Sequence, residues 1–158
     1  MSARADALAK RFEEQNAAVM ASVQKMSDAD WNAPTAAEDA RPRGVVAHHV
    51  AMSHHPTLGL MQAIASGQGA PPITWDMIHA GNAQHAEQSA NVSRDETLAL
   101  LRDNGQQVAE ALRGMSDEQL DMTAPLPLLG DHAMSAEQIG DFLVVGHIGM
   151  HAASIKGE

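Results

Sequence analysis

Apolar and polar positions alternate along this chain with the period of amphipathic helices. Over residues 5–26 the apolar positions recur three or four residues apart, and these are Leu8, Phe12, Val19, Met20 and Val23. Such spacing gathers apolar side chains on one helix face and predicts that this face packs against a core. A second helix is expected to start near Arg43. We expect Pro56 to kink or break it around residues 54–56, because proline removes a helix hydrogen bond.

Three further helical segments are predicted in the second half of the chain. A short helix covers residues 74–90, and the capping spacing Ser93-Arg94-Asp95-Glu96 starts a longer one that runs to Gly114. The stretch 124–131 is rich in proline and glycine and is expected to be a loop, after which Ser135 caps the last helix. No segment has the alternation typical of a strand. The chain is therefore predicted to be all-α.

A short sequence element occurs twice and organises these helices into two similar pairs. Residues 25–31, Lys-Met-Ser-Asp-Ala-Asp-Trp, resemble residues 114–120, Gly-Met-Ser-Asp-Glu-Gln-Leu, and an Ala-Pro pair follows each of them. In each half a long helix, a capped turn, a loop with proline and a second helix succeed one another. Two such pairs predict a single four-helix bundle domain over residues 1–158, with long connecting loops and residues 74–90 as an extra short helix.

Charge and composition narrow the classes of partner. The 158 residues include 20 acidic and 10 basic ones, for a formal net charge of −10, which repels nucleic-acid phosphates and anionic lipid. There is no cysteine, so a disulfide, a thiolate metal ligand and a cysteine nucleophile are excluded. The sequence begins with charged helical residues and has no apolar run of about 20 residues. We therefore expect a soluble cytoplasmic protein that binds neither nucleic acid nor membrane.

Two histidines with the spacing of metal ligands lie in the last predicted helix. His147 and His151 are four residues apart, so their side chains are offset by about 40° around the helix axis. Leu143, Val144 and Met150 fall on the same side, which predicts that both imidazoles face the core. Buried imidazoles need partners, because an unsatisfied buried polar group costs about 1–3 kcal/mol. A metal ion would satisfy both, and two separately hydrogen-bonded or partly exposed histidines are the alternative.

The second helix offers a third imidazole from a group of four histidines, His48, His49, His54 and His55. Helical geometry puts His49 on the apolar face and His48 about 100° away from it. His54 is expected to point outward, and His55 to lie on the flank. We therefore predict that His49, His147 and His151 bind a divalent metal and leave a coordination position open. His48 is the other candidate for third ligand, and otherwise a residue of the pocket rim.

The remaining histidines and the methionines are assigned plainer roles. His79 and His85 are about 120° apart around their helix, so they do not form a joint site. We expect both of them, and His132, to be surface or rim residues. Four methionines are expected to fill the core, and they are Met20, Met52, Met61 and Met150. No residue is assigned as a general base, so the catalytic residues are unknown at this point.

The segment Arg43-Gly44-Val45-Val46-Ala47-His48-His49-Val50-Ala51 resembles the second-helix histidine motif of the DinB-like family, which includes mycothiol-dependent maleylpyruvate isomerases. The pair His147-x-x-x-His151 resembles the metal motif in the last helix of that family, and the similarity extends over nearly the whole chain. The resemblance independently selects His49 and implies a four-helix bundle, a zinc or nickel ion and a homodimer. In the isomerases glutamate is typical at the position of His147. The chain is therefore similar to the three-histidine branch, and isomerase activity is not implied.

Two classes of function are consistent with such a site. The first is an enzyme acting on a small molecule, in which the open position activates water for hydrolysis or binds a low-molecular-weight thiol for transfer. The thiol route rests on the resemblance alone. The second is a non-catalytic bundle that binds a metal or a small ligand. A fourth ligand that saturates the metal would favour the second class.

Overall fold

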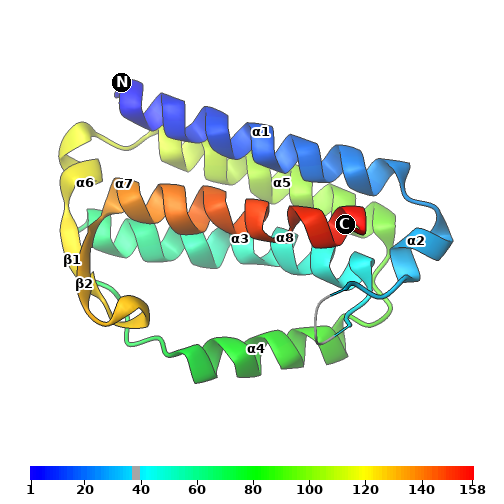
Figure 1. Cartoon of the computed structure of the whole chain (residues 1–158). Helices are drawn as coiled ribbons and strands as arrows, with labels where there is room; N and C mark the ends of the chain where they lie inside the picture. Colours follow the sequence, from blue (N-terminus) through cyan, green and yellow to red (C-terminus); the bar gives the residue numbers. More distant parts are fainter. Residues whose placement is uncertain (37–39) are drawn as a thin grey trace.

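The computed structural model describes residues 1–36 and 40–158 of the chain. Four long helical segments run alongside one another (Figure 1): α1 (Ala3–Lys25), α3 (Arg43–Ala65), α5 (Arg94–Arg113) and a C-terminal segment of α7 (Ala136–Ile139), the π-helix η2 (Gly140–Val145) and α8 (Gly146–Lys156). Each packs against two neighbours, in the order α1, α5, α3 and α8 around the bundle. The predicted all-α four-helix bundle is confirmed. Among the helices built from residues 1–36 and 40–158, none has both the length and the apolarity needed to cross a bilayer.

The duplicated sequence element has the same structure in both halves. Ser27 caps α2 (Asp28–Asn32) and Ser116 caps α6 (Asp117–Asp121), each through a reciprocal capping box with the third residue of its helix. In each half, two segments of the chain then pair in antiparallel fashion before the next bundle helix begins. Pro34 pairs with Pro42 before α3, and β1 (Thr123–Leu126) pairs with β2 (His132–Ser135) before α7. The two halves therefore follow one plan.

The hairpin of β1 and β2 replaces the loop predicted over residues 124–131, so the expectation that the chain has no strand is wrong. Each strand has four residues, which is too few for alternation to stand out. β1 also contains Pro125, a residue that usually argues against a strand. The sheet has only these two strands within the described residues, and Pro125 lies opposite Ala133, where an edge position tolerates a residue without an N–H. The 3-10 helix η1 (Pro127–Leu129) joins the strands.

Along its first half α3 is buried on every side, because each residue from 44 to 51 is buried. α3 continues through Pro56 as one helix, so the break predicted as one outcome around residues 54–56 does not occur. Hydroxyl groups bond to helix carbonyls beside the proline: Thr57 Oγ1 lies 2.9 Å from the carbonyl oxygen of Ser53 and 3.1 Å from that of His54. A helix surrounded by neighbours in this way has no single inward face.

The position of His54 corrects the outward direction expected from helical phase. His54 is 2% exposed, and its Nε2 lies 2.9 Å from the amide oxygen of Asn16 on α1. Because an amide oxygen can only accept, Nε2 carries a proton and donates it. Asn16 Nδ2 donates in turn to the carbonyl of Leu101 on α5 at 2.8 Å. Burial, with smaller effects of His147 and His55, lowers the pKa of His54 to about 4.

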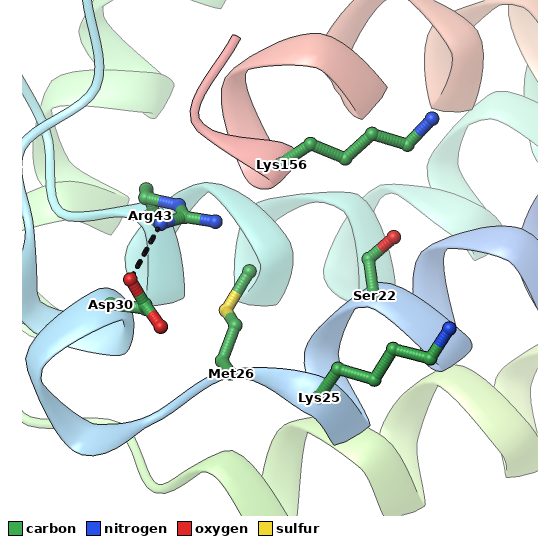
Figure 2. Close-up of a pocket in the computed structure, with 6 residues that line it drawn as sticks. All are labelled: Ser22, Lys25, Met26, Asp30, Arg43 and Lys156. Atoms are coloured by element: carbon green, nitrogen blue, oxygen red, sulfur yellow. Dashed lines mark hydrogen bonds and ion pairs between the residues drawn. The ribbon is translucent and has the colours of Figure 1, made fainter.

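The C-terminal ends of α1 and α8 border a cleft whose lining includes Lys25, Arg43, Lys156 and Asp30 (Figure 2). Arg43 Nε donates to the carbonyl of Ile155 at 2.8 Å, and its Nη1 lies 3.3 Å from a carboxylate oxygen of Asp30. Lys25 and Lys156 lie in the last turns of α1 and α8, where positive charge offsets the partial negative charge of a helix C-terminus. These contacts tie α2, α3 and α8 together, and Arg43 has a structural role in them.

The buried His54 makes an acid-sensitive contribution to stability. Its pKa falls from the ordinary value of 6.5 to about 4 on folding, so the stabilisation is complete above pH 6.5 and is lost as the pH falls toward 4. His54→Gln keeps a hydrogen-bond donor and removes the titration. Between pH 7 and pH 5 the free energy of unfolding of the wild type should fall by about 2 kcal/mol more than that of this variant. Urea unfolding of both proteins measures the difference, and parallel pH profiles would contradict the prediction.

Candidate metal centre

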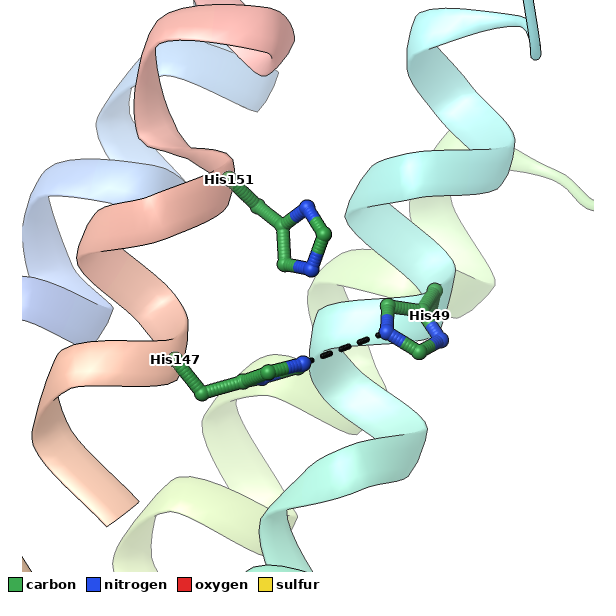
Figure 3. A group of neighbouring side chains, drawn as sticks. All are labelled: His49, His147 and His151. Atoms are coloured by element: carbon green, nitrogen blue, oxygen red, sulfur yellow. Dashed lines mark hydrogen bonds between the residues drawn. The ribbon is translucent and has the colours of Figure 1, made fainter. Parts of the chain in front are cut away.

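Three histidine side chains from two helices point toward one another inside the bundle (Figure 3). His147 and His151 lie one turn apart on α8, and His49 faces them from α3. Nε2 of His49 is 3.2 Å from Nε2 of His147, and one ligand nitrogen from each ring lies within 4.8 Å of the others. The ring centroids are 4.7 to 5.1 Å apart. The structure thus brings together the three residues that the sequence pattern combined into one site.

The backbone that precedes α8 determines where two of these rings point. α8 follows the π-helix η2 directly, and a wider π turn shifts the phase of every later side chain. η2 begins at Gly140, where a Cβ would lie 2.7 Å from the side chain of Leu8 and 3.1 Å from that of Met61. Glycine therefore lets the C-terminal segment approach α1 and α3 closely, which brings α8 within reach of His49.

Burial keeps two of the three imidazoles neutral. His49 is 8% exposed, and burial, followed by the proximity of His147 and His151, lowers its pKa to about 3. Burial and the neighbouring His151 lower the pKa of His147 to about 4. At neutral pH both rings are therefore neutral, which is the form of histidine that binds a metal.

The donor set fits a divalent transition metal. Within residues 1–36 and 40–158, the group that could hold a metal consists of these three histidines, with no carboxylate among them. Imidazole nitrogen suits zinc, nickel, copper and iron, whereas calcium and magnesium prefer oxygen. Three protein ligands leave at least one position open on a four-coordinate ion, which is the usual arrangement of catalytic zinc sites.

A second pair of histidines borders this group. His48, expected on the flank of its helix, is 8% exposed, and its Nδ1 lies 2.8 Å from Nε2 of His85 on α4 (Trp75–Gln88). The ring of His85 is 5.5 Å from that of His49. Sequence reasoning placed His85 at the surface or rim and did not connect it with His48. The spacing of residues within α4 does not show which residues of another helix they contact.

The other histidines and the methionines named in the sequence analysis differ in how exposed their side chains are. His79 and His132 are exposed, as expected, and Met61 is fully buried. The core role expected for Met52 and Met150 is wrong, because these side chains are 46% and 60% exposed. Each lies three residues after a histidine of the site.

Comparisons with known proteins agree with this architecture. A family model described as the DinB superfamily matches residues 5–155. The structure of YfiT from Bacillus subtilis, described as a probable metal-dependent hydrolase with an unusual four-helix bundle topology, matches with a TM-score of 0.73 and 21% identity, over 98% of this chain and 86% of that one. A mycothiol-dependent maleylpyruvate isomerase matches with a TM-score of 0.73 and 12% identity, over 99% of this chain and 64% of that one.

The structural matches and the family match establish different things about this chain. No curated protein matches the chain with significance, and at 21% and 12% identity the solved structures establish a shared fold. This chain spans slightly less than two thirds of the isomerase. The family match, in contrast, extends over nearly the whole sequence and includes all three histidines. The chain therefore belongs to the DinB superfamily.

Proposed function

We propose that this chain is a metal-dependent hydrolase of a small molecule, and that His49, His147 and His151 hold its divalent metal, zinc or nickel. The observation that carries the proposal is the convergence of three imidazole nitrogens within 4.8 Å of one another. Burial holds two of these rings in the neutral form that binds a metal. The description of YfiT as a probable metal-dependent hydrolase supports the same class of reaction.

An all-nitrogen donor set favours hydrolysis. Neutral ligands leave the full charge on a divalent ion, which can then lower the pKa of a coordinated water toward about 7 and polarise a carbonyl or phosphoryl oxygen. The helices α3 and α8 fix the directions of the three rings. The burial of His49 keeps competing protons and bulk water from its ring nitrogens. The chain thus supplies three ligands held by two helices, of which His49 and His147 are kept uncharged.

A thiol-dependent transferase is the second candidate. The fold shared with a mycothiol-dependent isomerase favours it, and an ion with an open position can bind a thiol as the reactive thiolate. Because the chain contains no cysteine, the thiol would come from a separate small molecule. The resemblance to the DinB-like family also implies a homodimer, which sedimentation of the purified protein would test.

The three histidines are expected to be required for metal binding. Protein purified without an affinity tag should contain about one divalent ion per chain, as expected for a site closed by three ligands. His49→Ala and His151→Ala should each lower the affinity for zinc about 100-fold or more, since even residues that only support a ligand are worth 10- to 100-fold. The exposed His55→Ala is the matched control from α3. Elemental analysis and a zinc titration measure the effect, and equal metal content in all variants would refute the site.

Removal of the metal is expected to abolish turnover. On a panel of esters, amides and phosphoesters, the loaded protein should hydrolyse at least one class, and a chelator should stop the reaction until zinc or nickel is returned. Hydrolysis without added thiol favours the first candidate. Turnover that requires a low-molecular-weight thiol favours the second. Turnover that persists in the fully chelated protein would show that the reaction does not use this site.

A further inference from the structure

His85 brings α4 to the edge of the metal group. The structure describes every residue of α4, and none of them is buried, so this helix lies beside the bundle and not within it (Figure 1). Its contacts with the rest of the chain include Trp75 Nε1, which donates to the carbonyl of Leu128 at 3.0 Å, and the ring of His85. That ring lies 5.5 Å from the ring of His49, close to the 4.7 to 5.1 Å between the three histidines of the site.

His48 holds the His85 ring in this position. The two rings are stacked, with centroids 5.0 Å and planes 18° apart, and Nδ1 of His48 lies 2.8 Å from Nε2 of His85. One of these nitrogens donates and the other accepts, so the hydrogen bond links the tautomers of the two rings. If His48 donates, His85 carries its own proton on Nδ1. If His85 donates, its Nδ1 offers a lone pair.

In either tautomer Nδ1 of His85 needs a partner. This atom is buried and has no hydrogen-bond partner within the part of the chain that the structure describes. Such an atom costs about 1–3 kcal/mol when it is left unsatisfied, and its presence in a native structure calls for a ligand, an ion or a water. The ring of His49 lies 5.5 Å from that of His85, so a small molecule bound beside His49 is close enough to be that partner.

We propose that Nδ1 of His85 hydrogen-bonds the small molecule that takes the open position of the metal, and that His48 is the positioning residue for this contact. The inference rests on the proposed function, because it requires a metal held by the three site histidines. His85 is not itself a metal ligand, since its Nε2 is engaged by His48 and its nitrogens lie outside the group within 4.8 Å. The ligand it fits has a nitrogen or oxygen atom at, or next to, the coordinated atom.

Azide binding to the cobalt-substituted protein tests this role, because the visible absorption of cobalt reports ligands that enter its coordination sphere. His85→Ala should weaken azide binding about tenfold, the loss expected for one hydrogen bond to a charged ligand, and leave cobalt affinity unchanged. His85→Gln returns a hydrogen-bonding group and should recover part of the azide affinity. His48→Ala should lose part of it. The matched control His79→Ala, on the exposed side of α4, should behave as the wild type.

The outcomes separate this inference from the proposed function. A wild-type protein that binds no cobalt would overturn both. Cobalt binding by the wild type with equal azide affinity in wild type and His85→Ala would overturn the role of His85 and leave the metal site standing. A fall in cobalt affinity in His85→Ala would make His85 a metal ligand, which also overturns the inference. Recovery in His85→Gln supports a hydrogen bond over a merely structural role for the ring.

Discussion

The burial of imidazoles along α3 is the constraint on which the rest of the structure depends. Three of its histidines are less than one-tenth exposed, and they are His48, His49 and His54. A buried imidazole must find a polar partner, because the protein interior does not replace the hydrogen bonds of water. His54 bonds to Asn16 on α1, and His48 bonds to His85 on α4. His49 faces the two histidines of α8. α3 is thus connected to three other helices through one type of side chain.

The duplicated plan of the chain explains why the site lies where it does. α3 and the segment from α7 to α8 occupy the same place in the two halves, each after a serine-capped short helix and a pair of antiparallel residues or strands. These two segments pack against each other, and the candidate ligands come from both. The halves differ at the site itself, because within residues 1–36 and 40–158 only the second half contains a π-helix next to its histidines. The π-helix shifts the phase at which the residues of α8 follow those of α7.

The helical pattern was sufficient to predict the bundle and the three converging histidines, because each of these depends on spacing within one helix. His147 and His151 share a face by their separation alone, and helical phase together with the resemblance to the DinB-like motif selected His49 over His48. The same reasoning failed for His54, since a helix with neighbours all round has no outward direction. It also failed for His85, whose partner lies on another helix. The hairpin escaped prediction because four-residue strands, one with a proline, carry almost no pattern.

The histidine group also couples metal binding to the stability of the bundle. The hydrogen bond between His49 and His147 occupies one nitrogen of each ring, whereas a single ion accepts a lone pair from all three rings. An ion that binds only the folded chain stabilises it by about 2.7 kcal/mol at a concentration 100 times its Kd. Because the ligands come from α3 and α8, metal binding stabilises the contact between these two helices. The proposed metal ligands therefore also join α3 to α8, and the geometry of the open position depends on the packing that the ion strengthens.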